Sequence, residues 1–315
     1  MKLPELKIGN LVARVPIIQG GMAIRISTSK LAAAVANEGG IGLIAASGMS
    51  FDELRQEIRL ARSMTTGIIG INIMVAAREF SGIVKTAIDE GIDLVVAGAG
   101  FSRDIFGLGK ESGTPIVPIV SSAKLAKISE KLGAAAIIVE GKEAGGHLGT
   151  DQSLHSLLPD IVKAVKIPVI GAGGIMNGFD IVETLKFGVA GVQMGTRFAA
   201  SNESNAAPAL KAFYLKARPE DIVLINSPVG LPGRALRNPF AEKIIESTAP
   251  APETCDGCLK HCLRNFCIIK ALIRAQQGDV ETGLVFTGEY IHKIDEILSV
   301  KEIFRRILAE IETIN

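Results

Sequence analysis

The stretch Val139-Glu140-Gly141-Lys142-Glu143-Ala144-Gly145-Gly146-His147-Leu148-Gly149 decides how this chain is interpreted. It ends the β-type run 136–139, and it holds four glycines, two carboxylates and one of the four histidines of the chain. A strand that stops in glycines and then presents a histidine is typical of the rim of an active site. The alternative is a flexible surface turn with an incidental histidine. Two further glycine-rich strand ends downstream favour the first interpretation.

Strand-like and helix-like patterns alternate eight times along the chain. Short apolar runs that favour strands occur at 15–18, 42–45, 68–73, 94–97, 116–120, 136–139, 169–171 and 191–194. Apolar residues at helical spacing occur at 30–38, 51–63, 82–90, 123–132, 157–165 and 178–186. Several of these segments are followed by glycine, as helices commonly are, at Gly39, Gly91, Gly133 and Gly188.

The predicted strands are apolar without alternation, which indicates burial on both faces and hence a parallel sheet. Eight such units predict a (β/α)8 TIM barrel, an α/β fold whose functional loops leave the carboxyl ends of the strands. An open doubly wound sheet is the alternative. It is disfavoured by the strand count and because the glycine-rich loops come late in the chain rather than after the first strand.

The repeating pattern stops after Met194. The segment 201–284 has weak periodicity, contains every cysteine of the chain and is rich in proline. We expect it to be a smaller, mostly helical insertion after the eighth strand that caps the barrel mouth. From 284 to 314 apolar residues return at helical spacing, which predicts a closing helix. The predicted domains are therefore a barrel of residues 1–200 and 285–315, and a cap of residues 201–284 with a cysteine segment at 255–267.

Composition limits the classes of function. Of the 315 residues 48% are hydrophobic and 4% aromatic, which suits a large aliphatic core. A net charge of +1 offers no basic surface, so no nucleic-acid partner is expected. The N-terminus lacks the apolar run of a signal peptide, and no uncharged apolar stretch reaches the roughly 18 residues that cross a membrane. We expect a cytoplasmic protein without a membrane partner, and the apolar closing helix suits a monomer or a homodimer.

Two more strand ends are rich in glycine. The seventh predicted strand runs into Gly171-Ala172-Gly173-Gly174-Ile175, and the eighth into Gln193-Met194-Gly195-Thr196-Arg197-Phe198. Loops at these two positions of a barrel form a recurrent phosphate site, because bare glycine backbone lets N–H groups approach an anion. The hydroxyl of Thr196 and the ammonium of Lys124 would complete such a site. The chain has neither a P-loop nor a dinucleotide fingerprint after its first strand.

Several motifs together resemble those of the nitronate monooxygenase (2-nitropropane dioxygenase) family, which also contains the flavin-dependent enoyl-acyl-carrier-protein reductase. The resemblance covers residues 10 to about 245. The motifs are Pro16-Ile17-Ile18-Gln19-Gly20-Gly21-Met22, Gly70-Ile71-Asn72-Ile73-Met74, Glu140 to Gly149, Gly171 to Ile175, Gln193 to Phe198 and Gly233-Arg234-Ala235-Leu236-Arg237-Asn238. The resemblance implies a barrel that binds FMN.

The resemblance also implies roles for single residues. His147 falls on the catalytic histidine of the family, and a histidine near neutral pKa can exchange a proton while a flavin exchanges electrons. The residues expected along the cofactor are Gly20, Gly21, Met22, Asn72, Lys124, Ala144, Gly145, Gly146 and Met194, and those expected at its phosphate are Gly173, Gly174, Gly195 and Thr196.

The predicted function is FMN-dependent oxidation of a small molecule, an alkyl nitronate or nitroalkane, with His147 as acid and base. The alternative is an NAD(P)H-dependent flavin enoyl reductase that acts on an acyl thioester of a carrier protein. Gln19 to Met22, Gly70 to Met74 and Glu203 to Ala206 look more like the enoyl reductase branch. Two options from other classes are a redox-sensing module that keeps FMN, and a phosphosugar lyase or isomerase without flavin.

All four cysteines lie within thirteen residues, as Cys255, Cys258, Cys262 and Cys267 in a C-x2-C-x3-C-x4-C pattern. Clustered thiols in a cytoplasmic protein favour a metal, because thiolates repel one another unless a cation neutralises them. Three options are open. The first is a 4Fe-4S cluster, which would favour a reductase or electron-transfer role. The second is structural zinc (Zn), with or without His261 as a ligand, and the third is unliganded or redox-active thiols. Residues 258–267 are expected to be helical, with Cys258 and Cys262 on one face.

Overall fold

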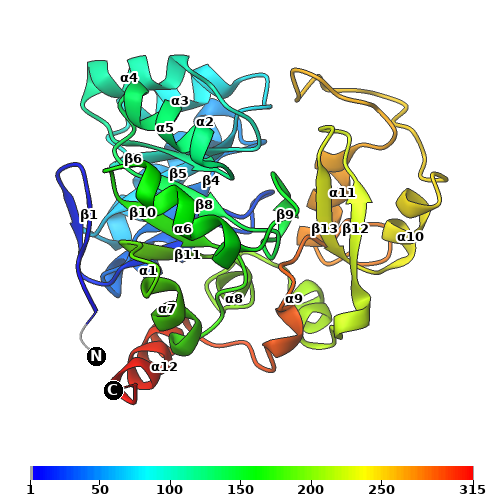
Figure 1. Cartoon of the computed structure of the whole chain (residues 1–315). Helices are drawn as coiled ribbons and strands as arrows, with labels where there is room; N and C mark the ends of the chain where they lie inside the picture. Colours follow the sequence, from blue (N-terminus) through cyan, green and yellow to red (C-terminus); the bar gives the residue numbers. More distant parts are fainter. Residues whose placement is uncertain (1–2, 315) are drawn as a thin grey trace.

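The computed structural model describes residues 3–314, and it contains a sheet of eight parallel strands surrounded by helices (Figure 1). The strands are β3 (Ile17–Gln19), β4 (Gly42–Ala45), β5 (Ile69–Met74), β6 (Leu94–Gly98), β7 (Ile116–Val120), β8 (Ile137–Glu140), β10 (Val169–Ala172) and β11 (Gly191–Met194). Their order is β3-β11-β10-β8-β7-β6-β5-β4. The two end strands meet at an Ile18–Ile41 bridge, where the Gln19 N–H donates to the Ile41 carbonyl at 2.9 Å. The predicted TIM barrel is thus confirmed.

Successive strand residues point alternately into the barrel and toward the helices. In β4, Leu43 belongs to the apolar cluster inside the barrel, whereas Ile44 belongs to the cluster beneath the helices. Both are fully buried, which explains why the strands show no polar alternation in the sequence. An N-terminal hairpin that the sequence did not predict, β1 (Leu6–Ile8) with β2 (Leu11–Ala13), contributes to the interior cluster and plugs the barrel.

The helices that surround the sheet begin and end where local chemistry allows. They are α1 (Ser29–Asn37), α2 (Phe51–Met64), α3 (Phe80–Asp89), α4 (Asp104–Ser112), α5 (Ala123–Leu132), α6 (Leu154–Ala164), α7 (Gly178–Leu185) and α8 (Thr196–Ala199). The Ser122 hydroxyl accepts from Leu125 N–H at the start of α5, and Gly133 ends that helix in the left-handed conformation. None of the helices within residues 3–314 is long and apolar enough to cross a bilayer.

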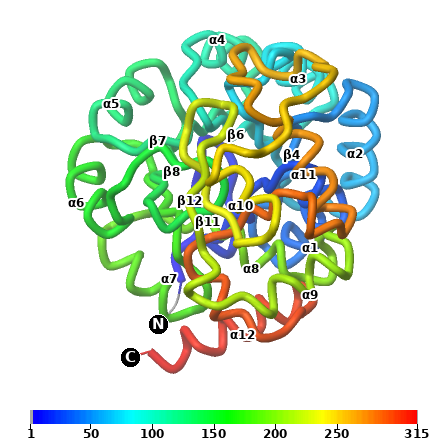
Figure 2. The backbone as a smooth tube through the Cα atoms, turned by 90° about the vertical axis from the view of Figure 1, so that its right-hand side faces the viewer, coloured from blue at the N-terminus to red at the C-terminus, as the bar shows by residue number. Residues whose placement is uncertain are grey.

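The segment 201–284 lies over one end of the barrel (Figures 1 and 2). It contains α9 (Pro208–Leu215), η1 (Pro219–Asp221), β12 (Ile222–Asn226), β13 (Pro232–Leu236), α10 (Pro239–Ile245) and α11 (Ile268–Gln276). The expectation of a mostly helical segment omitted the antiparallel pair of β12 and β13. A third strand, β9 (Gly146–His147), comes from the barrel loop and pairs with β13, so the cap is joined to the barrel through a small sheet.

The predicted closing helix of residues 284–314 is wrong at its start. Residues 284–299 form an irregular segment with one short 3-10 helix, η2 (Ile291–Lys293), and the helix α12 spans only Val300–Glu312. The Ser299 hydroxyl caps α12 by accepting from Glu302 N–H at 3.2 Å. The apolar residues before Ser299 pack against the cap and do not form a helix face: Ile291 and Ile294 are buried in a cluster that includes cap residues.

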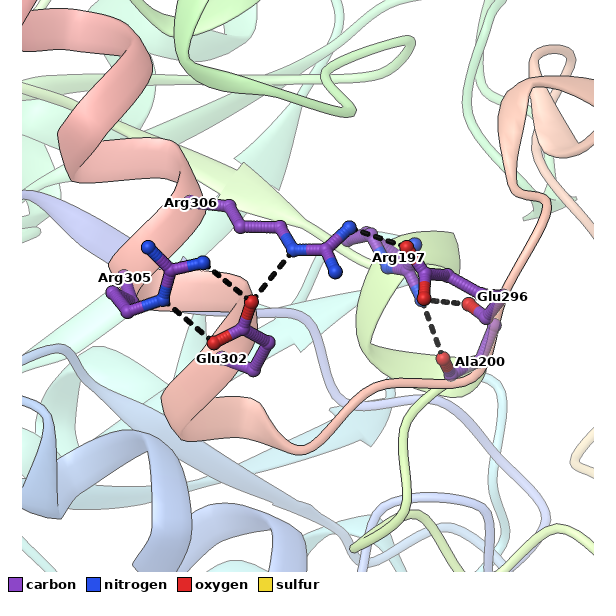
Figure 3. Close-up of polar contacts among 6 residues, drawn as sticks. All are labelled: Arg197, Ala200, Glu296, Glu302, Arg305 and Arg306. Atoms are coloured by element: carbon purple, nitrogen blue, oxygen red, sulfur yellow. Dashed lines mark hydrogen bonds and ion pairs between the residues drawn. The ribbon is translucent and has the colours of Figure 1, made fainter.

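An arginine network fixes the irregular segment to the barrel (Figure 3). The guanidinium of Arg197, just after β11, donates to the Ala200 carbonyl at 2.7 Å and to the Glu296 carbonyl at 2.8 Å. Arg306 of α12 bonds the side chains of Glu296 and Glu302, so α12 and the segment before it are held together. Burial lowers the pKa of Arg197 to about 10, and the group remains charged at neutral pH.

Candidate active site

A cavity opens at the carboxyl ends of the barrel strands, beneath the cap. It is lined by His147 and by every residue predicted to contact the cofactor except one: Gly20, Gly21, Met22, Asn72, Ala144, Gly145, Gly146, Gly173, Gly174, Met194, Gly195 and Thr196. The exception is Lys124, which is exposed on α5 and does not line the cavity. Residues that are far apart in the sequence therefore meet where barrel proteins place their ligands.

Two amide side chains in the cavity have an oxygen without a partner. The Asn72 Nδ2 group donates to the Gly21 carbonyl at 2.9 Å, but the buried Asn72 Oδ1 has no hydrogen-bond donor among the described residues. The buried Gln193 Oε1 also has none there. Unpaired buried acceptors are costly, so these two atoms indicate a ligand that brings N–H or O–H donors. Gly21 is required here because a Cβ atom would lie 2.3 Å from the Asn72 Cβ.

The glycine-rich loops after β10 and β11 line another part of the cavity. Gly173 and Gly174 have φ angles of +113° and +74°, a conformation that glycine adopts without strain. A Cβ on Gly195 would meet nothing closer than the Met22 sulfur at 3.7 Å, so the backbone there faces open space. The Thr196 hydroxyl accepts from Gly288 N–H at 3.0 Å and keeps its own proton to donate.

No lysine or arginine among the described residues lines this cavity. An anionic group bound there would rely on backbone N–H groups and hydroxyls. That is consistent with the glycine-rich loops, whose backbone N–H groups can come close to an anion.

His147 is held by the cap on several sides. Its backbone lies in β9, opposite Gly233 of β13, and its Nε2 atom lies 2.8 Å from the Ser227 hydroxyl. The Phe286 ring packs edge-on against the imidazole with centroids 5.2 Å apart. Burial lowers the pKa of His147 to about 4, so the imidazole is neutral at pH 7.

Ser227 is the hydrogen-bond partner of the imidazole. Its oxygen accepts from Val229 N–H at 3.3 Å and keeps a second lone pair, so the hydroxyl can donate to His147 Nε2 or accept from Nε2–H, according to the tautomer of the ring. Ser227 was not among the residues predicted from the sequence, because it lies 80 residues from the histidine and is brought there by the cap hairpin.

Two carboxylates at the end of β8 and in the loop after it differ in their surroundings. Glu140 lines the cavity, and burial raises its pKa to about 8, which keeps it largely protonated at neutral pH. Glu143 is structural, because its Oε2 atom accepts from Leu154 N–H at 3.0 Å at the start of α6. Arg234 of β13 fixes the same loop by donating to the carbonyls of Lys142 at 2.7 Å and Ala144 at 3.2 Å.

The cap supplies an apolar wall that the sequence did not predict. The cap residues of this wall are Leu210, Tyr214, Ile268, Ile269 and Leu272, and Phe286 from the segment after the cap completes it. The Tyr214 hydroxyl donates to the Phe286 carbonyl at 3.3 Å, and its ring is buried. An apolar wall opposite polar loops is typical of a small-molecule site.

The cysteine segment lies beside this cavity and not within it. The expected helix at 258–267 is wrong, since α11 begins only at Ile268. All four cysteines are free thiols. Burial raises the pKa of Cys258, and repulsion by the other three thiols, beginning with Cys267, raises it further. Across residues 3–314, no three histidine, cysteine or acidic side chains are arranged to hold a metal ion.

The fold and the cavity together define a class: (β/α)8-barrel proteins with a ligand site at the strand ends and a capping domain. Within that class the chain belongs to the nitronate monooxygenase family, because the family model described as "Nitronate monooxygenase" matches residues 5–93 and 76–310.

The family assignment is supported by similar solved structures and a similar curated protein. The structure of FabK from Thermotoga maritima is 36% identical with a TM-score of 0.84, over 95% of this chain and 93% of that one. A nitroalkane oxidase from Streptomyces ansochromogenes is 26% identical with a TM-score of 0.81, over 96% of this chain and 97% of that one. A hydroxy-methyl-oxo-octahydroindene-carboxyl-CoA dehydrogenase from Mycobacterium tuberculosis is 35% identical over 73% of this chain, which spans 65% of that relative's length.

Proposed function

We propose that this protein is an FMN-dependent oxidoreductase in which His147 donates and accepts the proton of the reaction. The observation that carries the proposal is that one cavity joins His147 to the glycine-rich loops and to two unpaired amide oxygens. Similarity to a nitroalkane oxidase and to a CoA-thioester dehydrogenase supports redox chemistry.

The residues present fit FMN. Asn72 and Gln193 offer acceptor oxygens to a ring that carries N–H groups, whereas Gly195 and Thr196 offer open backbone and a hydroxyl proton to a phosphate. FMN, when bound, supplies the capacity to accept or donate a hydride. Lys124 has no part in this site, so the phosphate would be held without a lysine.

The geometry around His147 suits proton transfer. Ser227 occupies Nε2, so Nδ1 is the ring nitrogen left to exchange a proton with a substrate. Packing against Phe286 orients the imidazole, and its burial lowers its pKa to about 4 and keeps it neutral at pH 7. When Nε2–H donates to Ser227, the unprotonated Nδ1 can accept a proton, and the imidazolium formed can return that proton to a developing carbanion.

Two substrates are candidates, and the cavity bears on the choice. Oxidation of an alkyl nitronate is the reaction that the family is named for, but a nitronate is an anion, and no cationic side chain among the described residues lines the cavity. The apolar wall of the cap favours the second candidate, NAD(P)H-dependent reduction of an enoyl thioester presented by a carrier protein. This substrate is neutral at the reacting carbons and has an apolar chain to bury.

Flavin reduction under anaerobic conditions tests both the class and the substrate. Purified protein should release FMN on denaturation, and NADH or NADPH should bleach the bound flavin. Addition of an enoyl thioester should then restore the colour if the second candidate is correct. Flavin that is restored only by oxygen, together with consumption of propyl nitronate, would assign nitronate oxidation instead. Protein that neither retains nor binds FMN would contradict the class.

A further inference from the structure

The cysteine segment is part of an unusually long irregular connection. Between the end of α10 at Ile245 and the start of α11 at Ile268 the chain forms neither helix nor strand, apart from one isolated bridge at Leu259. Connections of this length without secondary structure are uncommon in compact domains and are usually functional or disordered. Only two of its side chains, Leu259 and Phe266, are buried. The hydrophobic effect alone therefore gives this connection little to hold its shape.

Backbone contacts nevertheless fix where the cysteines lie. The Cys258 carbonyl accepts from Arg78 N–H at 3.0 Å, and Lys260 N–H donates to the Ala76 carbonyl at 2.9 Å. At the other end, Leu263 N–H donates to the Pro228 carbonyl at 2.9 Å. Backbone hydrogen bonds thus hold the segment against the loop after β5 and against the turn between β12 and β13.

The thiols share a second cavity that is rich in positive charge. Cys255, Cys258 and Cys262 line it, and Cys267 is close enough to Cys258 to interact electrostatically. The charged residues that line it are Arg78, Lys260 and Arg264, and no carboxylate is among the described lining residues. A cationic environment stabilises thiolates and the net negative charge of a centre that four thiolates would ligate.

The positions of the thiols bear on whether they would bind a zinc ion or an iron–sulfur cluster. Zinc holds its sulfur ligands at about 2.3 Å, so four ligands of one ion must converge on a single point. No three such side chains within residues 3–314 converge in this way. A four-iron cluster binds each thiolate at a different iron, so its four ligands are spread around the cluster. Three of the four thiols line one cavity, and the fourth, Cys267, interacts electrostatically with Cys258, so a cluster with four separate irons suits them better than a single ion.

We propose that Cys255, Cys258, Cys262 and Cys267 bind a 4Fe-4S cluster that fixes the connection 246–267 against the loop after β5. Binding would release the four thiol protons and replace thiol repulsion with iron–sulfur bonds. Because Cys267 directly precedes Ile268 and Ile269, which line the main cavity, the cluster would also hold the apolar wall of the cap in place. The proposal does not depend on the identity of the substrate or on bound flavin.

The test is metal analysis of the full chain, purified without oxygen and then incubated with ferrous iron, sulfide and a thiol reductant. We expect about four irons and four sulfides per chain, as a cluster held by four cysteines requires. Dithionite should reduce the centre and produce an electron paramagnetic resonance signal that is separate from any flavin radical. The double variant Cys258→Ser, Cys262→Ser should retain less than about one iron per chain.

The matched control is His261→Ala, which changes a lining residue of the same cavity that is not a proposed ligand. This variant should keep its iron. Stoichiometric zinc in the wild-type protein, no metal at all, or iron that is unchanged in the double variant would each overturn the proposal. Analysis of the wild-type protein decides between these outcomes even if the double variant fails to fold.

Discussion

Substitution of Gly195 by valine separates the proposed ligand site from the stability of the fold. Many glycines of this chain are required by packing: a Cβ on Gly145, for example, would lie 2.6 Å from the backbone of Thr287. Gly174 has a φ of +74°, and a Cβ there would lie 2.8 Å from the Tyr290 ring, so its substitution would strain the protein itself. Gly195 has neither problem, since its φ is −102° and the nearest neighbour of a Cβ would be the Met22 sulfur at 3.7 Å.

Gly195→Val should therefore weaken FMN binding much more than it changes the stability of the protein. The free energy of unfolding of the protein without flavin should change by less than about 1 kcal/mol, because the added carbons enter open space. FMN binding should weaken, because the same carbons would keep the phosphate away from the backbone. Loss of one hydrogen bond to a charged group costs about 1.5 to 3 kcal/mol, which corresponds to roughly a 10- to 150-fold rise in Kd.

The assay has two parts. Flavin fluorescence quenching gives the Kd of FMN, and urea unfolding of the flavin-free protein gives the free energy of unfolding. Gly107→Val is the control, because Gly107 is exposed on α4 and its Cβ would meet nothing within 4 Å. An unchanged Kd in the Gly195 variant would refute the placement of the phosphate, whereas a large loss of stability would refute the claim that this position faces open space.

Three further predictions concern the residues around the proton-transfer step. His147→Ala should lower turnover by roughly 100-fold while FMN stays bound, since general acid and base catalysis contributes at least about that much, and wild-type rates would remove His147 from the mechanism. Ser227→Ala should lower turnover by about tenfold, because it removes one orienting hydrogen bond of about 1.4 kcal/mol. Ser227→Thr should restore turnover, and failure to do so would mean that Ser227 supports only the fold. Glu140→Gln should stabilise the protein at pH 8 more than at pH 5. Burial raises the pKa of Glu140 to about 8, so the wild-type protein loses stability as pH rises from about 4.5 through 8. Urea unfolding measures this loss, and an equal pH dependence in both proteins would contradict the prediction.

The barrel could be predicted from the sequence because its pattern is local. Strands β4, β7 and β11 and helix α5 have the predicted bounds, since each apolar run is bounded by glycine, proline or a capping serine that acts over a few residues. Helix α4 was missed because Gly107 and Gly109 interrupt its apolar spacing.

The cap could not be predicted in the same way, because distant contacts determine it. The apolar run of β12 is visible in the sequence, yet its partner β13 begins with proline and contains glycine, both unfavourable in strands. The cysteine segment has helical spacing, but Gly257 and Arg264 adopt positive φ angles of +62° and +58°, which no helix accommodates. Phe286 lies in a segment that was expected to be helical and instead lines the cavity.

The barrel and the cap contribute differently to the surroundings of His147. The barrel loop supplies its backbone, the cap supplies β13 and Ser227, and the segment after the cap supplies Phe286; these contacts set the orientation and burial of the ring. The proposed cofactor ligands, by contrast, come almost entirely from barrel loops. If FMN binds as proposed, substitutions in the cap should change the substrate and the rate of proton transfer while FMN affinity stays the same, because the cap lines the part of the cavity around His147 and the strand ends would hold the cofactor.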